Sequence, residues 1–169
     1  TDQTFSIEVA HPTDLDEYNR VDISMTIDAT HFTLDDNDVL YQIADAINSA
    51  MYTAVIDETI DSEEQIRASV VTEESGKSRL VLRSESSGFT NRMVFTDSAD
   101  SLLSTLGVTD AVVSTGTAGG YITDVGTNAT DSMLNSKFKI DGLDFYRDSN
   151  NVTDALTGVT LKLLNTAAT

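Results

Sequence analysis

The chain has 169 residues, with 28 acidic and 10 basic side chains and a formal net charge of −18. It has no cysteine, which excludes disulfides, zinc thiolate sites and cysteine nucleophiles. Its few basic side chains disfavour binding to nucleic acid, which depends on neutralising phosphates. No apolar run approaches the roughly 18 residues of a membrane span. Apolar patterns extend through most of the chain, which is long enough to bury a real core, so we expect ordered structure.

Strict alternation of apolar and polar residues predicts two strands near the start of the chain. One covers residues 5–9, and the clearer one covers residues 21–28, with its apolar side chains on a single face. Residues 10–19 contain the only proline and four acidic side chains, which is typical of a loop. We expect residues 31–34 to form the strand that returns beside residues 21–28.

The period then changes from two to the spacing of a helix. We predict a helix over Val39–Met51 that buries Val39, Ile43, Ile47 and Ala50. The acidic residues 35–38 fit capping of this helix better than a calcium loop. An EF-hand would need glycine at its sixth position and glutamate at its twelfth, and neither is present.

The middle of the chain predicts further short elements. Residues 67–72 and 79–83 flank a short loop with a glycine and should form a hairpin, and residues 92–96 should form a strand. A small helix with Leu102, Leu103 and Leu106 should end at Gly107. Residues 109–127, rich in threonine and glycine, form either a linker or a weakly specified pair of strands.

The last segment contains the strongest hairpin signal, Asp141-Gly142, between two short strands. A two-residue loop sets the register, which places apolar pairs on one face of the hairpin and a lysine–aspartate pair on the other. The expected pairs are Ile140 with Leu143, Lys139 with Asp144, and Phe138 with Phe145. We predict a short helix over residues 151–156, ended by Gly158, and a strand over residues 159–163.

A shift of 113 positions aligns two segments of the chain, matching Ile27-Asp28 with Ile140-Asp141 and Phe32 with Phe145. Both copies are predicted to contain a hairpin, a polar cap, a helix and a strand. The expected fold class is therefore α+β and strand-rich, with antiparallel sheets that each carry a short helix packed across them. We expect a larger module at residues 1–110, and a linker plus a smaller module at residues 111–169.

No combination of side chains predicts catalysis, a cofactor or a metal, so the expected sets of catalytic, cofactor-binding and metal-binding residues are empty. His11 and His31 fall on polar positions, and the glycine-rich residues 115–120 lack the lysine of a phosphate loop. The acidic residues 14–17 fit a solvated loop better than a weak calcium site. The sequons at Asn128 and Asn151 match by pattern only. A hydrolase that uses a carboxylate pair is the least favoured alternative.

Two regions resemble the flagellar filament cap family (hook-associated protein 2, FliD type). Residues 138–145 and 147–164 resemble the segment before the C-terminal part of these proteins. Residues 27–50, with 68–70 and 78–84, are similar to the flagellin hook IN motif, and residues 102–107 continue it. The resemblance covers most of residues 21–165. The family's long terminal helices have no counterpart here, so we expect the chain to correspond to the middle domains, D2 and D3.

The resemblance implies a structural protein, not an enzyme, that caps the growing filament and promotes flagellin assembly by protein–protein contacts. It implies export to the flagellum tip outside the cell, or in the periplasm where flagella are internal. The implied partners are flagellin and further copies of the same protein, with contact to host surfaces or mucin in some members, and neither nucleic acid nor membrane. Two alternatives stay open: an outer variable domain of a flagellin or hook–filament junction protein, and a surface adhesion module that binds glycans or calcium.

Overall fold

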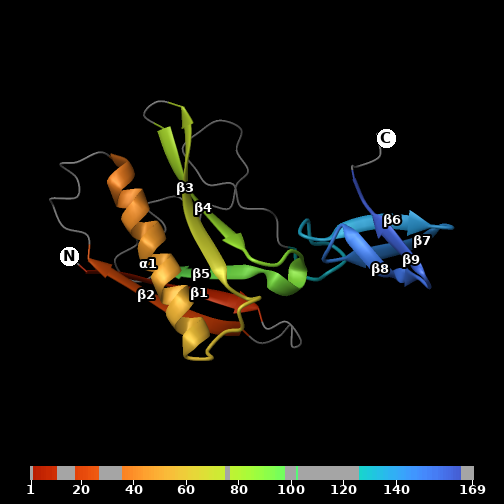
Figure 1. The fold of residues 1–169 in the computed structure, drawn as a ribbon, viewed down its shortest axis with the longest axis horizontal. Coiled ribbons are helices and arrows are strands. Elements are labelled where there is room, and N and C mark those ends of the chain that lie inside the picture. Colours follow the sequence, from red (N-terminus) through yellow and green to blue (C-terminus); the bar gives the residue numbers. More distant parts are fainter. Residues whose placement is uncertain are drawn as a thin grey trace.

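The computed structural model describes residues 2–10, 18–26, 36–74, 77–97, 102 and 126–164. These residues form one long helix, α1, a single-turn 3-10 helix, η2, and nine strands in four small antiparallel sheets. Figure 1 shows strands β1 to β5 around α1, with β6 to β9 gathered beyond η2. The α+β, strand-rich class expected from the sequence is confirmed. No helix among the described residues is both long enough and apolar enough to cross a membrane.

The first sheet has the strand order β2-β1-β5. β1 (Asp2–Ala10) pairs antiparallel with β2 (Tyr18–Thr26) along its whole length, and β5 (Met93–Asp97) adds to the other edge of β1. Phe5, Ile7 and Val9 are buried, as their alternation predicts. The described partner of β2 is therefore β1. Residues 31–34, which we expected beside it, lie outside the described residues.

Helix α1 (Asp36–Ile56) confirms the predicted helix and continues five residues beyond Met51. Ile43, Ile47 and Met51 are fully buried, and Val39 and Ala50 pack partly buried against the same core. Of the residues 35–38 that we expected to cap this helix, 36–38 instead form the first turn of α1 itself, and residue 35 lies outside the described residues. Asn48 fixes α1 to the second sheet, because its amide donates to the Ala68 carbonyl at 2.9 Å and accepts from the Ala68 N–H at 2.8 Å.

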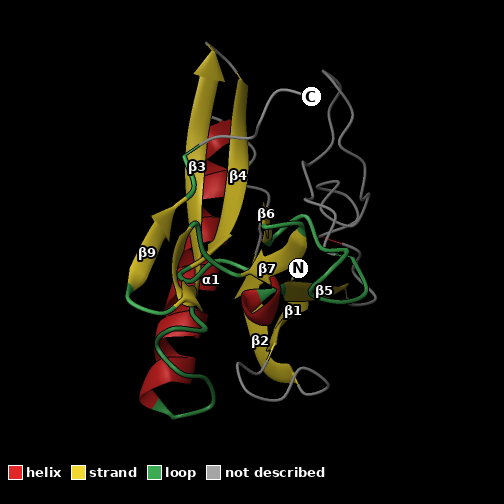
Figure 2. Cartoon of the chain, turned by 90° about the vertical axis from the view of Figure 1, so that its right-hand side faces the viewer, coloured by secondary structure: helices red, strands yellow, loops and turns green. Residues whose placement is uncertain are grey.

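The predicted hairpin in the middle of the chain is confirmed as β3 (Ile66–Glu74) and β4 (Lys77–Ser84). One face of this hairpin packs on α1 and contributes Ile66, Ala68 and the partly buried Leu82 to the core. Figure 2 shows the two strands lying along α1. Leu102 is helical and buried in this core, as expected, whereas the rest of that predicted helix and residues 109–125 fall outside the described residues.

The C-terminal hairpin has the register that its two-residue loop predicts. β6 (Ser136–Ile140) pairs with β7 (Leu143–Arg147), which places Phe138 opposite Phe145. The two rings stack with centroids 5.4 Å apart and planes 12° from parallel. Asp141 and Gly142 have φ angles of +50° and +85°, so both loop residues adopt the left-handed conformation of a type I′ turn.

The helix predicted over residues 151–156 is wrong, because this segment is a strand. β8 (Asn151–Leu156) forms a hairpin with β9 (Val159–Lys162), and Gly158 (φ +77°) lies in the turn between them. Six residues are too few to offset the cost of nucleating a helix unless packing supports it. The strand instead buries Val152 opposite Leu161. The second copy of the repeat therefore lacks its helix, and residues 126–164 do not repeat the hairpin–helix–strand order.

Candidate interaction surfaces

The described residues contain no group of three or more histidine, cysteine, aspartate or glutamate side chains placed to hold a metal ion. His11, His31, the acidic residues 14–17 and the glycine-rich residues 115–120 lie outside the described residues. The features that stand out in the described part of the chain are surfaces: a polar junction, a charged network and several exposed apolar positions.

The junction joins the N-terminal strands to residues 126–164 through the single turn η2 (Phe89–Asn91). The Phe89 N–H donates to Asn135 Oδ1 at 2.8 Å, and the Asn135 amide donates to the Ala129 carbonyl at 3.0 Å. Ser87 Oγ donates to the Asp148 carbonyl at 2.6 Å, and the Thr90 hydroxyl donates to the Asp148 carboxylate. Residues 46 to 61 positions apart in the sequence are thus held together by directional polar contacts.

Gly88 and Arg92 complete this junction. Gly88 is buried with φ +96°, and a Cβ atom built on it would lie 2.1 Å from the Asp148 Cβ. Only glycine allows the two segments to approach this closely. The buried guanidinium of Arg92 lies 4.2 Å from the centre of the Phe89 ring and donates to the Phe89 carbonyl at 3.1 Å. The contact of a cation with an aromatic face thus supports the geometry of the turn.

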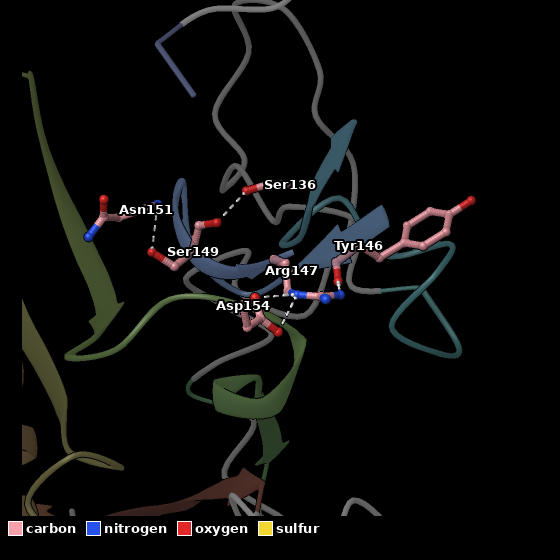
Figure 3. A network of polar contacts seen from close by, with 6 residues as sticks. All are labelled: Ser136, Tyr146, Arg147, Ser149, Asn151 and Asp154. Carbon is pink, nitrogen blue, oxygen red and sulfur yellow. Dashed lines mark hydrogen bonds and ion pairs between the residues drawn. The ribbon is translucent and has the colours of Figure 1, made fainter. Parts of the chain in front are cut away.

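A second polar network links the two C-terminal hairpins (Figure 3). Arg147 Nε donates to both carboxylate oxygens of Asp154, at 2.9 and 3.0 Å, and Arg147 Nη1 donates to the Tyr146 carbonyl at 2.8 Å. Ser136 Oγ donates to the Ser149 carbonyl at 3.0 Å. The hydrogen bond from Arg147 lowers the pKa of Asp154 below its ordinary value, since it stabilises the charged carboxylate.

The turn at residues 127–131 is organised by Asp131. Its carboxylate accepts from the Asn128 N–H at 2.9 Å, from the Thr127 hydroxyl at 2.7 Å and from the Thr127 N–H at 2.9 Å. These bonds, the Asn128 backbone bond first, hold the pKa of Asp131 below its ordinary value. Asn128, of the first sequon, is exposed within this turn, and Asn151, of the second, begins β8.

The C-terminal hairpins expose apolar side chains next to their turns. Leu143 is 67% exposed, and Leu156 pairs with Val159, with both exposed. Residues 126–164 carry four basic and five acidic side chains, a net charge of −1, whereas residues 1–125 carry six and 23, a net charge of −17. The C-terminal hairpins therefore combine exposed apolar side chains with near neutrality, and the strongly acidic composition belongs to the rest of the chain.

Comparisons with known proteins agree on one family. The family model described as "Flagellar hook-associated protein 2 C-terminus" matches residues 134–169. The curated flagellar hook-associated protein 2 of Salmonella typhimurium is 33% identical over 110 residues, which is 65% of this chain and 21% of that protein. The chain thus spans about a fifth of the length of this relative.

Solved structures of the same family share the fold. The FliD D1-D2-D3 domains from Escherichia coli cover 100% of this chain at a TM-score of 0.57 and 23% identity, with 40% of that chain covered. FliD from Pseudomonas aeruginosa covers 97% of this chain at a TM-score of 0.52 and 24% identity, with 62% of that chain covered. The FliD D2-D3 domains from Serratia marcescens cover 100% of this chain at a TM-score of 0.54 and 19% identity, with 71% of that chain covered. The resemblance drawn from the sequence is confirmed.

Sequence reasoning identified the C-terminal hairpin but missed the junction. Gly88, Asn135 and Asp148 come from three separate segments, and no spacing rule connects them. The one available signal was Gly88 between two predicted strands, since an isolated glycine there marks a close approach of backbones. The host-surface or mucin contact implied by the resemblance gains no support, because none of these matches names such a partner.

Proposed function

We propose that this chain, a segment of a protein of the flagellar hook-associated protein 2 family, works as a structural part of the cap at the tip of the bacterial flagellar filament. The observation that carries the proposal is the match of residues 134–169 to the family model, together with the 33% identical relative. Two of the structural neighbours are flagellar cap proteins, which supports the same role.

The role is one of binding rather than catalysis. The cap acts outside the cell, or in the periplasm where flagella are internal, and contacts flagellin and further copies of the same protein. The chain offers surfaces suited to such contacts: exposed apolar side chains at the turns of the C-terminal hairpins, and a strongly acidic N-terminal part. Exposed apolar positions with a polar rim are typical of protein interfaces.

We further propose that the chain divides into a larger module at residues 1–110 and a smaller one within residues 111–169. The buried apolar cluster consists of residues from β1, α1 and β3 together with Ile60 and Leu102, which supports a core confined to the first module. The η2 junction then sets the orientation of the second module, because its hydrogen bonds and the close approach at Gly88 leave little freedom. A cap needs such fixed geometry to present its contact surfaces to incoming subunits.

The decisive experiment compares a strain that lacks the full-length gene with the same strain carrying the gene on a plasmid. We expect the deletion strain to release flagellin into the medium without building filaments, and the plasmid to restore filaments visible by electron microscopy. Normal filaments in the deletion strain would refute the proposal. A plasmid encoding an unrelated exported flagellar protein serves as the control.

Immunogold labelling with antibodies against this chain separates the proposal from its closest alternative. A cap component gives a single label at the distal tip of each filament. An outer domain of a flagellin labels the whole shaft, and a junction protein labels the hook end. Label along the shaft or at the hook would therefore replace the cap proposal by that alternative.

A further inference from the structure

The outward face of the β3–β4 hairpin, opposite α1, carries an unusual set of side chains. By the register, three cross-strand pairs lie on this face: Arg67 with Arg83, Ser69 with Val81, and Val71 with Arg79. Val71 is 47% exposed, and Arg67, Ser69, Val81 and Arg83 are exposed as well, while Arg79 is half-buried. We call these six residues the arginine–valine face.

The arginine–valine face is rich in positive charge, whereas residues 1–125, to which it belongs, are strongly acidic in composition. Residues 1–125 carry only six basic side chains against 23 acidic ones, and three of the six stand together here. Arg67 and Arg83 lie directly opposite each other, an arrangement that costs stability because like charges repel. Arg67 forms an exposed ion pair with Glu85, whereas Arg83 has no ion pair within the described residues. The stability of the sheet does not explain why three arginines cluster on this face. A role in binding the carboxylates of another molecule would explain it.

The C-terminal end of α1, the helix that packs on this hairpin, carries apolar and acidic side chains that complement the arginine–valine face. Tyr52 and Ile56, in the last turns of α1, are 64% and 62% exposed, although large apolar side chains normally favour burial. The chain then continues with four exposed acidic side chains and no basic residue before Arg67. These four residues are Asp57, Glu58, Asp61 and Glu63. We call Tyr52, Ile56 and these four acids the acidic end of α1.

We propose that the arginine–valine face of one copy of this chain binds the acidic end of α1 of a second copy. Arginine forks pair with carboxylates, and Val71 and Val81 contact the exposed Tyr52 and Ile56. Each surface has the apolar and the charged groups that the other requires. The inference rests on the proposed cap function, in which several copies stand together, and it assigns the surfaces through which they meet.

The two surfaces differ, so the contact is heterologous: each copy offers its arginine–valine face to one neighbour and its acidic end to another. Repetition of such a contact closes a ring or extends as a helix, depending on the rotation between neighbours. A symmetric contact between two acidic ends, or between two arginine–valine faces, is disfavoured because like charges would meet. The charge pattern therefore selects one pairing out of the three available.

Disulfide trapping tests this pairing directly, because the chain contains no natural cysteine. Ser69→Cys places a thiol in the arginine–valine face, and Ser62→Cys places one at the acidic end; both positions are exposed. We expect an oxidised mixture of the two variants to yield several-fold more mixed dimer than either homodimer. Thr160→Cys, exposed on β9, mixed with Ser69→Cys gives the baseline of random collisions. A mixed yield at that baseline overturns the proposal.

Charge reversal provides an independent check. Arg79→Glu with Arg83→Glu in the Ser69→Cys chain should lower the mixed yield roughly tenfold, since close charge pairs couple strongly. Asp57→Lys with Glu58→Lys in the Ser62→Cys partner should restore it. Restoration distinguishes pairing from damage to the fold, and its failure in chains with unchanged circular dichroism refutes the contact.

The cross-linking result and the result of the deletion strain can be told apart, so failure of this contact differs from failure of the proposed cap function. A baseline mixed yield, together with loss of filaments in the deletion strain, means that the cap role stands and the assigned surfaces are wrong. A high mixed yield, together with normal filaments in the deletion strain, means that the contact is real and the cap role is wrong.

Discussion

Gly88→Ala should separate the two parts of the chain at their junction. Gly88 has φ +96° and ψ 171°, a region of backbone space that side chains other than glycine essentially avoid. The strain of an alanine there costs about 2 kcal/mol. The added Cβ would also lie 2.1 Å from the Asp148 Cβ and 2.5 Å from its Cα, so one of the two backbones must move.

That movement breaks the hydrogen bonds from Ser87 and Thr90 to Asp148, each contributing about 1 kcal/mol. Together with the backbone strain, the free energy of unfolding should fall by about 4 kcal/mol. The loss weakens the contact between η2 and residues 126–164. Urea denaturation followed by circular dichroism measures the loss, and amide NMR shows whether the Phe89 N–H keeps its bond to Asn135.

Gly142→Ala is the matched control. Gly142 also has a positive φ, +85°, but a Cβ added there meets nothing within 4 Å. An alanine at this position has backbone strain but no steric overlap, so the free energy of unfolding should fall by only about 1 kcal/mol. If the two variants lose the same free energy within about 0.5 kcal/mol, the close approach at Gly88 does not stabilise the junction.

Three further outcomes follow from the described contacts. Ile43→Asp places a charge in the core at a fully buried site and should cost at least about 4 kcal/mol in thermal or urea unfolding, whereas Tyr41→Asp, on the exposed side of α1, should change stability by less than about 0.5 kcal/mol. Asp131 and Asp154 have lowered pKa values, so their bonds support the fold above pH 3.8 and are lost as the pH falls through the folded values; NMR titration midpoints at or above 3.8 would contradict this. Lys139→Ala removes an exposed ion pair with its cross-strand partner at 3.1 Å and should cost less than about 1 kcal/mol in urea, and a larger loss would show that the pair is shielded from water.

Local chemistry was sufficient for the elements whose signals are short in range. The spacing of Ile43, Ile47 and Ala50 indicated a helix, because residues four and seven positions apart share a face at a 3.6-residue period, whereas residues seven apart lie on opposite faces of a strand. Asp141-Gly142 required a tight turn, since both residues tolerate positive φ, and a two-residue loop leaves one register for Phe138 and Phe145. Part of the family resemblance came from the same hairpin region, which the family model also covers.

Tertiary structure decided the features that depend on distant partners. Residues 151–156 have a pattern compatible with a helix or a strand, and the burial of Val152 opposite Leu161 selected the strand. The pairing of β5 with β1 joins segments about 90 residues apart, and the junction at Gly88 joins η2 to Asp148. A single sequence records which faces are apolar and which turns are tight. It does not record which buried surfaces meet, because that choice is made by the packing free energy of the whole chain.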